Sequence, residues 1–296
     1  MKKVQILSLI IFAVSVAVFG AYKVHSLANN DSVGPKIEMD QYTISVSSSA
    51  TEEELLAGVT AADQKDGDVT DTLIVEKMGN FIENGRREIT IAAFDSDNHI
   101  TKSSREVVYT DYRAPQFSLT APLKFPVGTS NVLAYMSAND VLDGSLTENI
   151  KISGEYTVTV DEPGDYPMLF TVSNSAGDVS SLPVTVTIYD GAEEAKKPQI
   201  TLSQYIVYTT PGVAVNPWDY VLAIQIDKRL YERGEDGILR DASPAEGQIR
   251  TEVRPEEVAI TQNFDYNAPG VYEVTYQIAD ADGNVGSMRL IVVVSE

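Results

Sequence analysis

Two short runs joined by a turn decide the fold of this chain. Asp165–Ser173 reads DYPMLFTVS, the turn 174–179 reads NSAGDV, and Leu182–Ile188 reads LPVTVTI. Apolar residues alternate with polar ones through much of both runs, and valine, threonine, isoleucine and tyrosine suit the pleated surface of a sheet. The segment therefore predicts two strands that pair across the turn.

The same unit of strand, turn and strand occurs three times in the 296 residues. Its turn reads DSDNHI at 95–100 and DADGNV at 280–285 in the other copies. The glycine that opens the first strand is Gly85, Gly164 or Gly270. Turns and glycines are separated by the same intervals, 79 and then 106 positions. The chain therefore contains three copies, and the third is longer through an insertion around 227–255.

A second motif precedes each unit. It reads DQKDGDVT at 63–70 and DVLDGSLT at 140–147, and it is degraded in the third copy. Each copy also opens a short β-rich run with a proline, at Pro35, Pro115 and Pro198. Short strands with turns about every 8–12 residues predict an all-β chain of three tandem immunoglobulin-like β-sandwiches. Their expected boundaries are 36–112, 113–190 and 198–296.

These motifs resemble the bacterial Ig-like repeat family of the Cry22-type pesticidal crystal protein, which is also found in surface proteins of Gram-positive bacteria. The resemblance is carried by Asp-x-x-Asp-Gly-Asp/Ser-Val/Leu-Thr, by the Gly-Val/Asp-Tyr strand and by the Asp-x-x-Gly-Asn-Val turn, over residues 36–296. In the third copy the match is good over Pro269–Val294. The resemblance implies the fold and a surface location, and the family shares no enzymatic activity.

The N-terminus predicts export. Val4–Tyr22 is a run of 19 residues without a charge, preceded by Lys2 and Lys3. A helix over this run reaches about 28 Å, close to the thickness of the hydrocarbon core of a membrane. Lysines before the run favour a cytoplasmic N-terminus. Residues 1–29 are therefore expected to be a signal anchor, or a signal peptide cleaved near Ser26-Leu27-Ala28, with the rest of the chain outside the cell membrane.

Composition excludes several classes of partner and site. The chain has 22 basic and 43 acidic residues, a net charge of −21, so nucleic acid is a poor partner. It has no cysteine, which removes disulfides, thiolate metal sites and cysteine nucleophiles. His25 and His99 are the only histidines, and the common nucleophile and zinc-protease motifs are absent from the sequence. We therefore expect no enzymatic activity.

Acidic residues cluster at two turns of the first copy: Asp63, Asp66, Asp68, Asp95 and Asp97. Because Ca²⁺ takes about six to eight oxygen ligands, these residues are candidate calcium ligands. Aspartate also bonds to its own backbone in turns, where glycine supplies a positive φ. The second copy keeps the turns but has Ser145 and Ala176 at positions of expected ligands. Turn formation is therefore favoured, and calcium binding remains the alternative.

The third copy carries the candidate recognition surface. Its insertion is rich in basic residues, and the single tryptophan comes just before it. Arginine, tryptophan and tyrosine are enriched at binding hot spots, and loops on a rigid sandwich often carry function. The candidate partner-binding residues are Trp218, Tyr220, Arg229, Arg233 and Arg240. The alternative is a decorated hairpin with solvated charges and Trp218 in the core of the third sandwich.

These features together predict a non-catalytic cell-surface protein with its sandwiches in a row, as a semi-rigid rod. Its expected role is that of an adhesion or binding module, or a spacer, and its expected ligand is a protein or a cell-wall polysaccharide. The alternative is a structural or assembly subunit, whose rods associate through exposed strand edges or with Ca²⁺.

Overall fold

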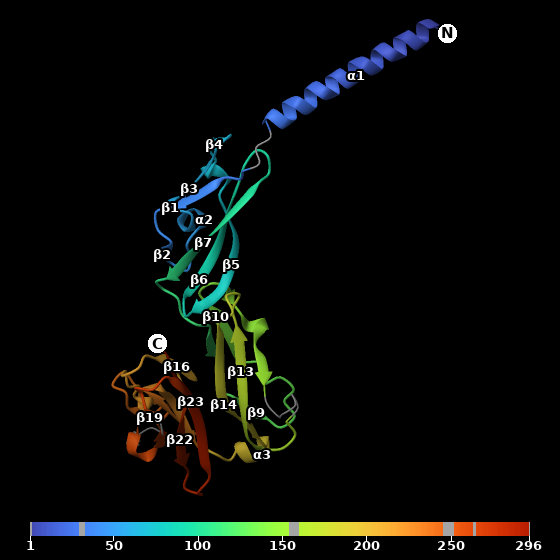
Figure 1. Ribbon diagram of the computed structural model, residues 1–296. Coiled ribbons are helices and arrows are strands. Elements are labelled where there is room, and N and C mark those ends of the chain that lie inside the picture. Colours follow the sequence, from blue (N-terminus) through green and yellow to red (C-terminus); the bar gives the residue numbers. More distant parts are fainter. Residues whose placement is uncertain (1, 30–32, 154–159, 245–251, 263–264, 296) are drawn as a thin grey trace. The chain divides into compact units, whose positions relative to one another are not determined.

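The computed structural model describes residues 2–29, 33–153, 160–244, 252–262 and 265–295. These residues form one long N-terminal helix and six β-sheets, two in each of three sandwiches (Figure 1). The expected all-β fold of immunoglobulin-like sandwiches after an N-terminal helix is confirmed. The chain divides into two compact units, Met1–Tyr112 and Arg113–Glu296.

Helix α1 (Lys2–Asn29) contains the apolar run. Its segment Gln5–Val24 has a mean hydropathy of 2.1, and none of it is buried against the rest of the protein. Soluble proteins rarely expose a contiguous apolar surface of this extent to water. The helix is long and apolar enough to cross a membrane, and a signal sequence near an N-terminus has the same properties.

The first sandwich combines a sheet of order β1-β3-β4 with a sheet of order β2-β7-β6-β5. Its elements are β1 (Lys36–Met39), β2 (Thr43–Val46), α2 (Glu52–Leu55), β3 (Val59–Asp63), β4 (Gly67–Asp68), η1 (Thr70–Thr72), β5 (Ile74–Glu83), β6 (Arg86–Phe94) and β7 (Ile100–Tyr109). Alternate side chains of β6 and β7 point into the core, so Ile89, Ile91 and Val107 are fully buried. The side chains between them point outward.

The second sandwich repeats this topology, with sheets β8-β10-β11 and β12-β13-β14-β9. Its elements are β8 (Gln116–Leu119), β9 (Lys124–Pro126), β10 (Met136–Asp140), β11 (Gly144–Ser145), η2 (Thr147–Asn149), β12 (Lys151–Ser153), β13 (Gly164–Ser173) and β14 (Val179–Tyr189). In both sandwiches a parallel pair closes one edge of the four-stranded sheet: β2 with β7, and β9 with β14. Helix α3 (Gly191–Glu194) leads to the third sandwich.

The third sandwich has sheets β15-β17-β18-β19-β20 and β16-β23-β22-β21. Its elements are β15 (Gln199–Leu202), β16 (Ile206–Thr209), η3 (Pro217–Tyr220), β17 (Val221–Ile226), β18 (Arg229–Arg233), β19 (Leu239–Asp241), β20 (Glu252–Val253), η4 (Pro255–Glu257), β21 (Ala259–Gln262), β22 (Gly270–Ala279) and β23 (Val285–Val294). The insertion expected around 227–255 forms the hairpin β18–β19 and strand β20, which widen the first of these sheets. Its residues 245–251 lie outside the described residues.

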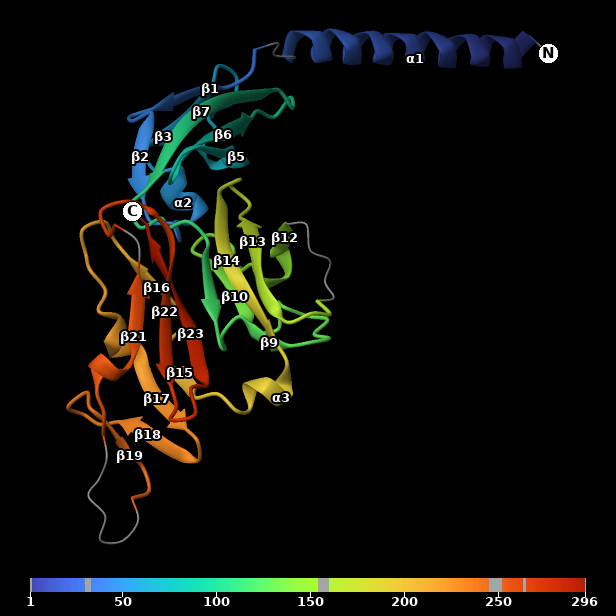
Figure 2. The same cartoon turned by 90° about the horizontal axis from the view of Figure 1, so that it is seen from below.

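Sandwiches two and three lie side by side within the second unit (Figures 1 and 2). Ile291 points out of its own sandwich, yet it is only 4% exposed because it packs into the apolar core of the second sandwich. Ile206, Val271 and Val293 pack against the same core. The expected rod of sandwiches in a row is therefore wrong for these two, because their sheet faces contact each other.

Polar contacts cross the same junction. Arg289 donates two hydrogen bonds to the carboxylate of Asp165, at 3.1 and 2.5 Å, and a third to Thr187 Oγ1 at 2.5 Å. Thr185 donates from its backbone N–H and its hydroxyl to Glu273, at 2.6 and 3.0 Å. These paired charges and hydrogen bonds fix the register of the two sandwiches.

Acid should weaken this junction. The hydrogen bonds from Arg289 lower the pKa of Asp165, although burial acts in the opposite direction. A carboxyl whose pKa is lower in the folded state adds stability above its unfolded pKa of about 4, and that stability is lost as pH falls through the folded pKa. The difference in urea stability between the wild type and Asp165→Asn should therefore be largest near pH 7 and shrink towards pH 2. A difference that stays constant over this range would contradict the expectation.

Candidate functional site

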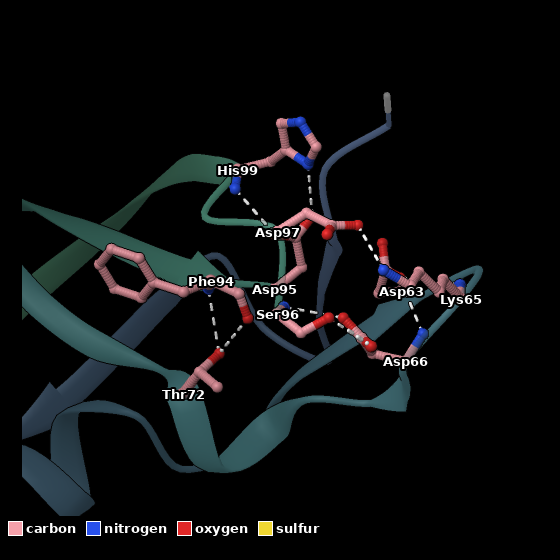
Figure 3. Close-up of polar contacts among 9 residues, drawn as sticks. All are labelled: Asp63, Lys65, Asp66, Thr72, Phe94, Asp95, Ser96, Asp97 and His99. Atoms are coloured by element: carbon pink, nitrogen blue, oxygen red, sulfur yellow. Dashed lines mark hydrogen bonds and ion pairs between the residues drawn. The ribbon is translucent and has the colours of Figure 1, made fainter. Parts of the chain in front are cut away.

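Two acidic turns of the first sandwich lie next to each other (Figure 3). One turn joins β3 to β4, and the other joins β6 to β7. These turns and the strand ends beside them contain all five candidate calcium ligands, so their geometry decides what those carboxylates do.

Asp63 organises the first turn. Its Oδ1 accepts hydrogen bonds from the backbone N–H of Lys65 at 2.8 Å and of Asp66 at 2.9 Å. Gly67 completes the reversal with φ of 77°, a conformation that glycine adopts without strain. Asp140 makes the same two contacts in the second sandwich, at 2.8 and 3.1 Å. The repeated Asp-Gly motif is therefore a turn motif.

Asp66 joins the two turns. Its carboxylate accepts from the backbone N–H and from the hydroxyl of Ser96, both at 2.8 Å (Figure 3). Asp143 and Ser175 form the equivalent pair in the second sandwich, with both distances 2.6 Å. Sequence reasoning missed the two serines. The sequence did contain a signal for these serines. In the two copies that have Asp66 or Asp143, a serine follows the first residue of the second turn.

The second turn is built around Asp95, whose side chain is only 1% exposed. Its carboxylate accepts from the backbone N–H of His99 at 2.7 Å and lies 2.7 Å from the His99 ring Nδ1. Burial raises the pKa of Asp95, but the hydrogen bonds from His99 outweigh it and hold the pKa below its usual value. Asn98 adopts φ of 68° here, where the other copies have Gly177 and Gly283.

Asp68 and Asp97 also have local partners. Asp68 accepts from the backbone N–H of Thr70 at 3.0 Å, and its hydrogen bonds with Thr70 lower its pKa. Asp97 forms an ion pair with Lys65 at 2.6 Å. All five carboxylates therefore have partners within the first sandwich.

These contacts are those of turn formation, which the sequence favours, and calcium binding remains the alternative. Ca²⁺ requires several oxygens that converge on one point. In the part of the chain that the structure describes, no group of three or more acidic or histidine side chains could hold a metal ion. Five separate donor groups or ion-pair partners instead engage these carboxylates, so the structure does not assemble them as a ligand set: Asp63, Asp66, Asp68, Asp95 and Asp97.

One carboxylate oxygen in this cluster is unsatisfied. Asp63 Oδ2 is buried and has no hydrogen-bond partner among the described residues. The matching atom of the second sandwich, Asp140 Oδ2, accepts from the side-chain amide of Asn174 at 3.2 Å. In the first sandwich Asp95 occupies the position of Asn174. The carboxylate of Asp95 is an acceptor where the amide of Asn174 is a donor, so it gives Asp63 Oδ2 no hydrogen bond.

The second candidate region surrounds Trp218, in η3. Trp218 is half-buried against the core of the third sandwich, and so is Tyr220. The guanidinium of Arg233 lies 5.7 Å from the centre of the Trp218 ring and donates to the carbonyls of Trp218 and Val221, at 2.8 and 3.2 Å. Arg233 thus ties strand β18 to η3.

The other two arginines lie on separate strands. Arg240, on β19, forms two hydrogen bonds to Asp236, at 2.7 and 2.6 Å, and lowers the pKa of Asp236 to about 2. Arg240 also donates to Glu252 at 3.2 Å. Arg229 is exposed at the start of β18. The alternative from the sequence was a decorated hairpin with solvated charges and Trp218 in the core; Trp218 does pack against the core, but Arg233 and Arg240 are paired within the sandwich. A role of these residues in partner binding stays a prediction.

Comparison with known proteins gives the chain no family. No family model matches it. An uncharacterized 81.3 kDa protein of Acholeplasma phage L2 is 24% identical over 188 residues, which is 64% of this chain and 22% of the phage protein. The chain therefore spans about a fifth of that relative. The resemblance to the Cry22-type repeat family stays a prediction.

Solved structures similar to this chain include extracellular domains of protocadherins. The protocadherin gamma-B4 extracellular domain is 15% identical over 90% of this chain and 50% of that chain, with a TM-score of 0.22. Mouse cadherin-23 EC22-24 is 14% identical over 88% of this chain and 98% of that chain, with a TM-score of 0.19. The CBM51-2 and INT domains of Clostridium perfringens ZmpB are 13% identical over 88% of this chain and 41% of that chain, with a TM-score of 0.21. Scores this low carry no argument about what the chain binds.

The turn geometry predicts that calcium does not stabilise this protein. An ion at a concentration 100 times its Kd would add about 2.7 kcal/mol and raise the melting temperature visibly. The melting temperature in millimolar CaCl₂ should instead equal that in EDTA, with MgCl₂ as the control for ionic strength. A rise specific to Ca²⁺ would show that the acidic turns hold the ion after all.

The orphaned oxygen predicts a stabilising substitution. Asp95→Asn should supply the amide donor that Asn174 supplies in the second sandwich, and so stabilise the first sandwich by about 1 kcal/mol at pH 7. Urea unfolding of the purified protein measures this change. The reverse substitution, Asn174→Asp, is the matched control and should destabilise the second sandwich. A loss of stability in Asp95→Asn would show that the contact with His99 outweighs the orphaned acceptor.

Proposed function

We propose that this chain is a non-catalytic protein of the bacterial cell surface, which acts as an adhesion or binding module, or a spacer, outside the membrane. The observation that carries the proposal is the apolar segment Gln5–Val24, none of which is buried, followed by acidic β-sandwiches. An unburied apolar helix of this length is stable in a lipid bilayer, and the sandwiches that follow it are water-soluble folds.

The proposed ligand is a protein or a cell-wall polysaccharide. The net charge of −21 opposes binding to nucleic acid. The acidic turns and the arginines Arg233 and Arg240 serve the fold through the contacts described above. We assign no catalytic step to them, and the three-copy pattern supports kinship with bacterial surface repeats.

The observation that speaks for the alternative, an assembly subunit, is the exposed strand β5. This strand has ten residues and lies at the open edge of its sheet, where Ile74, Met78 and Ile82 are exposed at 41%, 43% and 63%. Three irregularities in its register with β6, and an exposed Lys77, are features that natural edge strands use against pairing. The binding module is therefore preferred over the assembly subunit.

The absence of native cysteine makes the topology directly measurable. Asn80→Cys, on β5, should react with a membrane-impermeant maleimide in intact cells, and Lys3→Cys should react only after the membrane is opened. Intact mass of the purified protein shows whether residues 1–28 remain. Labelling of Asn80→Cys only in opened cells would refute the surface location.

Sedimentation of the protein without α1 separates the two candidate functions. A binding module should remain a monomer at micromolar concentration, because the irregular register and Lys77 of β5 oppose pairing at that edge. Association that Ile82→Lys abolishes would favour the assembly subunit instead.

A further inference from the structure

The three long hairpins of the chain share one register. β6–β7 pairs Arg86 with Val108, β13–β14 pairs Asp165 with Thr187, and β22–β23 pairs Val271 with Val293. Two residues further along, the pairs are Glu88 with Glu106, Pro167 with Thr185 and Glu273 with Ile291. All these side chains point away from their own sandwich, because the residues between them fill its core. We call these residues the outer face of each hairpin.

The outer faces of the second and third sandwiches contact each other. Thr185 of the second meets Glu273 of the third, and Asp165 and Thr187 meet Arg289. Ile291, which corresponds to Thr185 in the repeat, is buried in this contact. Both sandwiches thus use equivalent positions, as two copies of one fold do when they pack face to face.

The neighbouring parallel strands extend the contact. Lys124 on β9 pairs in register with Thr187, and Tyr208 on β16 holds the equivalent place opposite Val293. Lys124 donates to the carbonyl of Ser287 at 3.2 Å and forms an ion pair with Glu194 of the connecting helix. The Tyr208 hydroxyl accepts from the backbone N–H of Phe117 at 2.7 Å, and burial raises its pKa to about 12.

The first sandwich has a different outer face. Arg86 forms an ion pair with Glu106 at 2.8 Å, and Glu88 lies opposite Glu106 in the register. Glu88 is exposed and accepts from the hydroxyl of Ser104 at 3.0 Å. Burying three charged groups against another sheet would cost the hydration of each one. The outer face of the first sandwich is therefore better suited to contact with solvent than with another sheet.

We propose that the outer face of β13–β14 is a docking surface for the third copy of the repeat, so that residues 113–296 fold and unfold as one unit. The charges on the outer face of β6–β7 exclude the first copy from the same docking. The chain then has two cooperative units where the three copies suggest three. The third sandwich consequently presents to ligands its other sheet, β15-β17-β18-β19-β20, because its outer hairpin face is occupied.

Two probes in the full chain, purified in detergent, test this unit. Trp218 is the only tryptophan and reports on the third sandwich. A fluorophore on Lys151→Cys, in exposed strand β12, reports on the second. In the otherwise unmodified chain both probes should give the same urea midpoint. Arg289→Asp places a carboxylate opposite Asp165 and Glu273, and it should separate the two midpoints by about 0.5–1 M urea for units of this size.

Controls distinguish docking from general damage. Asp165→Arg together with Arg289→Asp restores the pair with its charges exchanged and should bring the midpoints together again. Arg86→Asp makes the same change of charge in the first sandwich, at the position that corresponds to Asp165, and should leave both midpoints unchanged. If Arg289→Asp fails to fold, Asp165→Asn removes the same contact more mildly and should produce a smaller separation. Separate midpoints in the parent chain, or coincident midpoints in both single variants, would overturn the proposal.

Discussion

The alternation of side chains along the three long hairpins is the constraint on which the rest of this structure depends. Inward positions such as Ile89, Phe170 and Leu290 are fully buried in each copy and hold each sandwich together. Residues at outward positions do not fill the core of their own sandwich, so they differ among the copies. The first copy places the ion pair of Arg86 with Glu106 there. The second and third copies place complementary groups there and bury them against each other.

The turns of the first two copies are also alike, and their aspartates make the same contacts. An aspartate that receives the N–H groups of its own turn, as Asp63 and Asp140 do, needs no ion to neutralise it. The bridge from Asp66 to Ser96, and from Asp143 to Ser175, ties two turns at one end of each sandwich. These contacts explain why acidic residues recur in a chain that is already strongly acidic. They act locally through N–H and hydroxyl donors and do not converge on a shared centre.

Much of the fold could be predicted because the same sequence pattern occurs three times in the chain. The strands, the turn glycines and the apolar helix all followed from local residue types. The docking of the third sandwich did not, because it depends on contacts between residues far apart in sequence, such as Thr185 with Glu273, 88 positions apart, and Asp165 with Arg289, 124 positions apart. A signal was present: Leu290–Val294 reads LIVVV without alternation, which is typical of a strand buried on both faces. The hydrogen-bond partners of the five aspartates could not be predicted for a similar reason, since their spacing in the sequence does not show which way each carboxylate points.

The most direct test of face-to-face docking is a distance measurement between spin labels on the second and third sandwiches. Labels on Lys151→Cys and Gln262→Cys would occupy exposed strands, β12 and β21, in a chain without other cysteines. A docked pair predicts one narrow distance distribution, which broadens when Thr185→Glu introduces the glutamate of the first copy opposite Glu273. A distribution that is already broad in the parent chain, and unchanged by Thr185→Glu, would show two independent sandwiches and contradict the account.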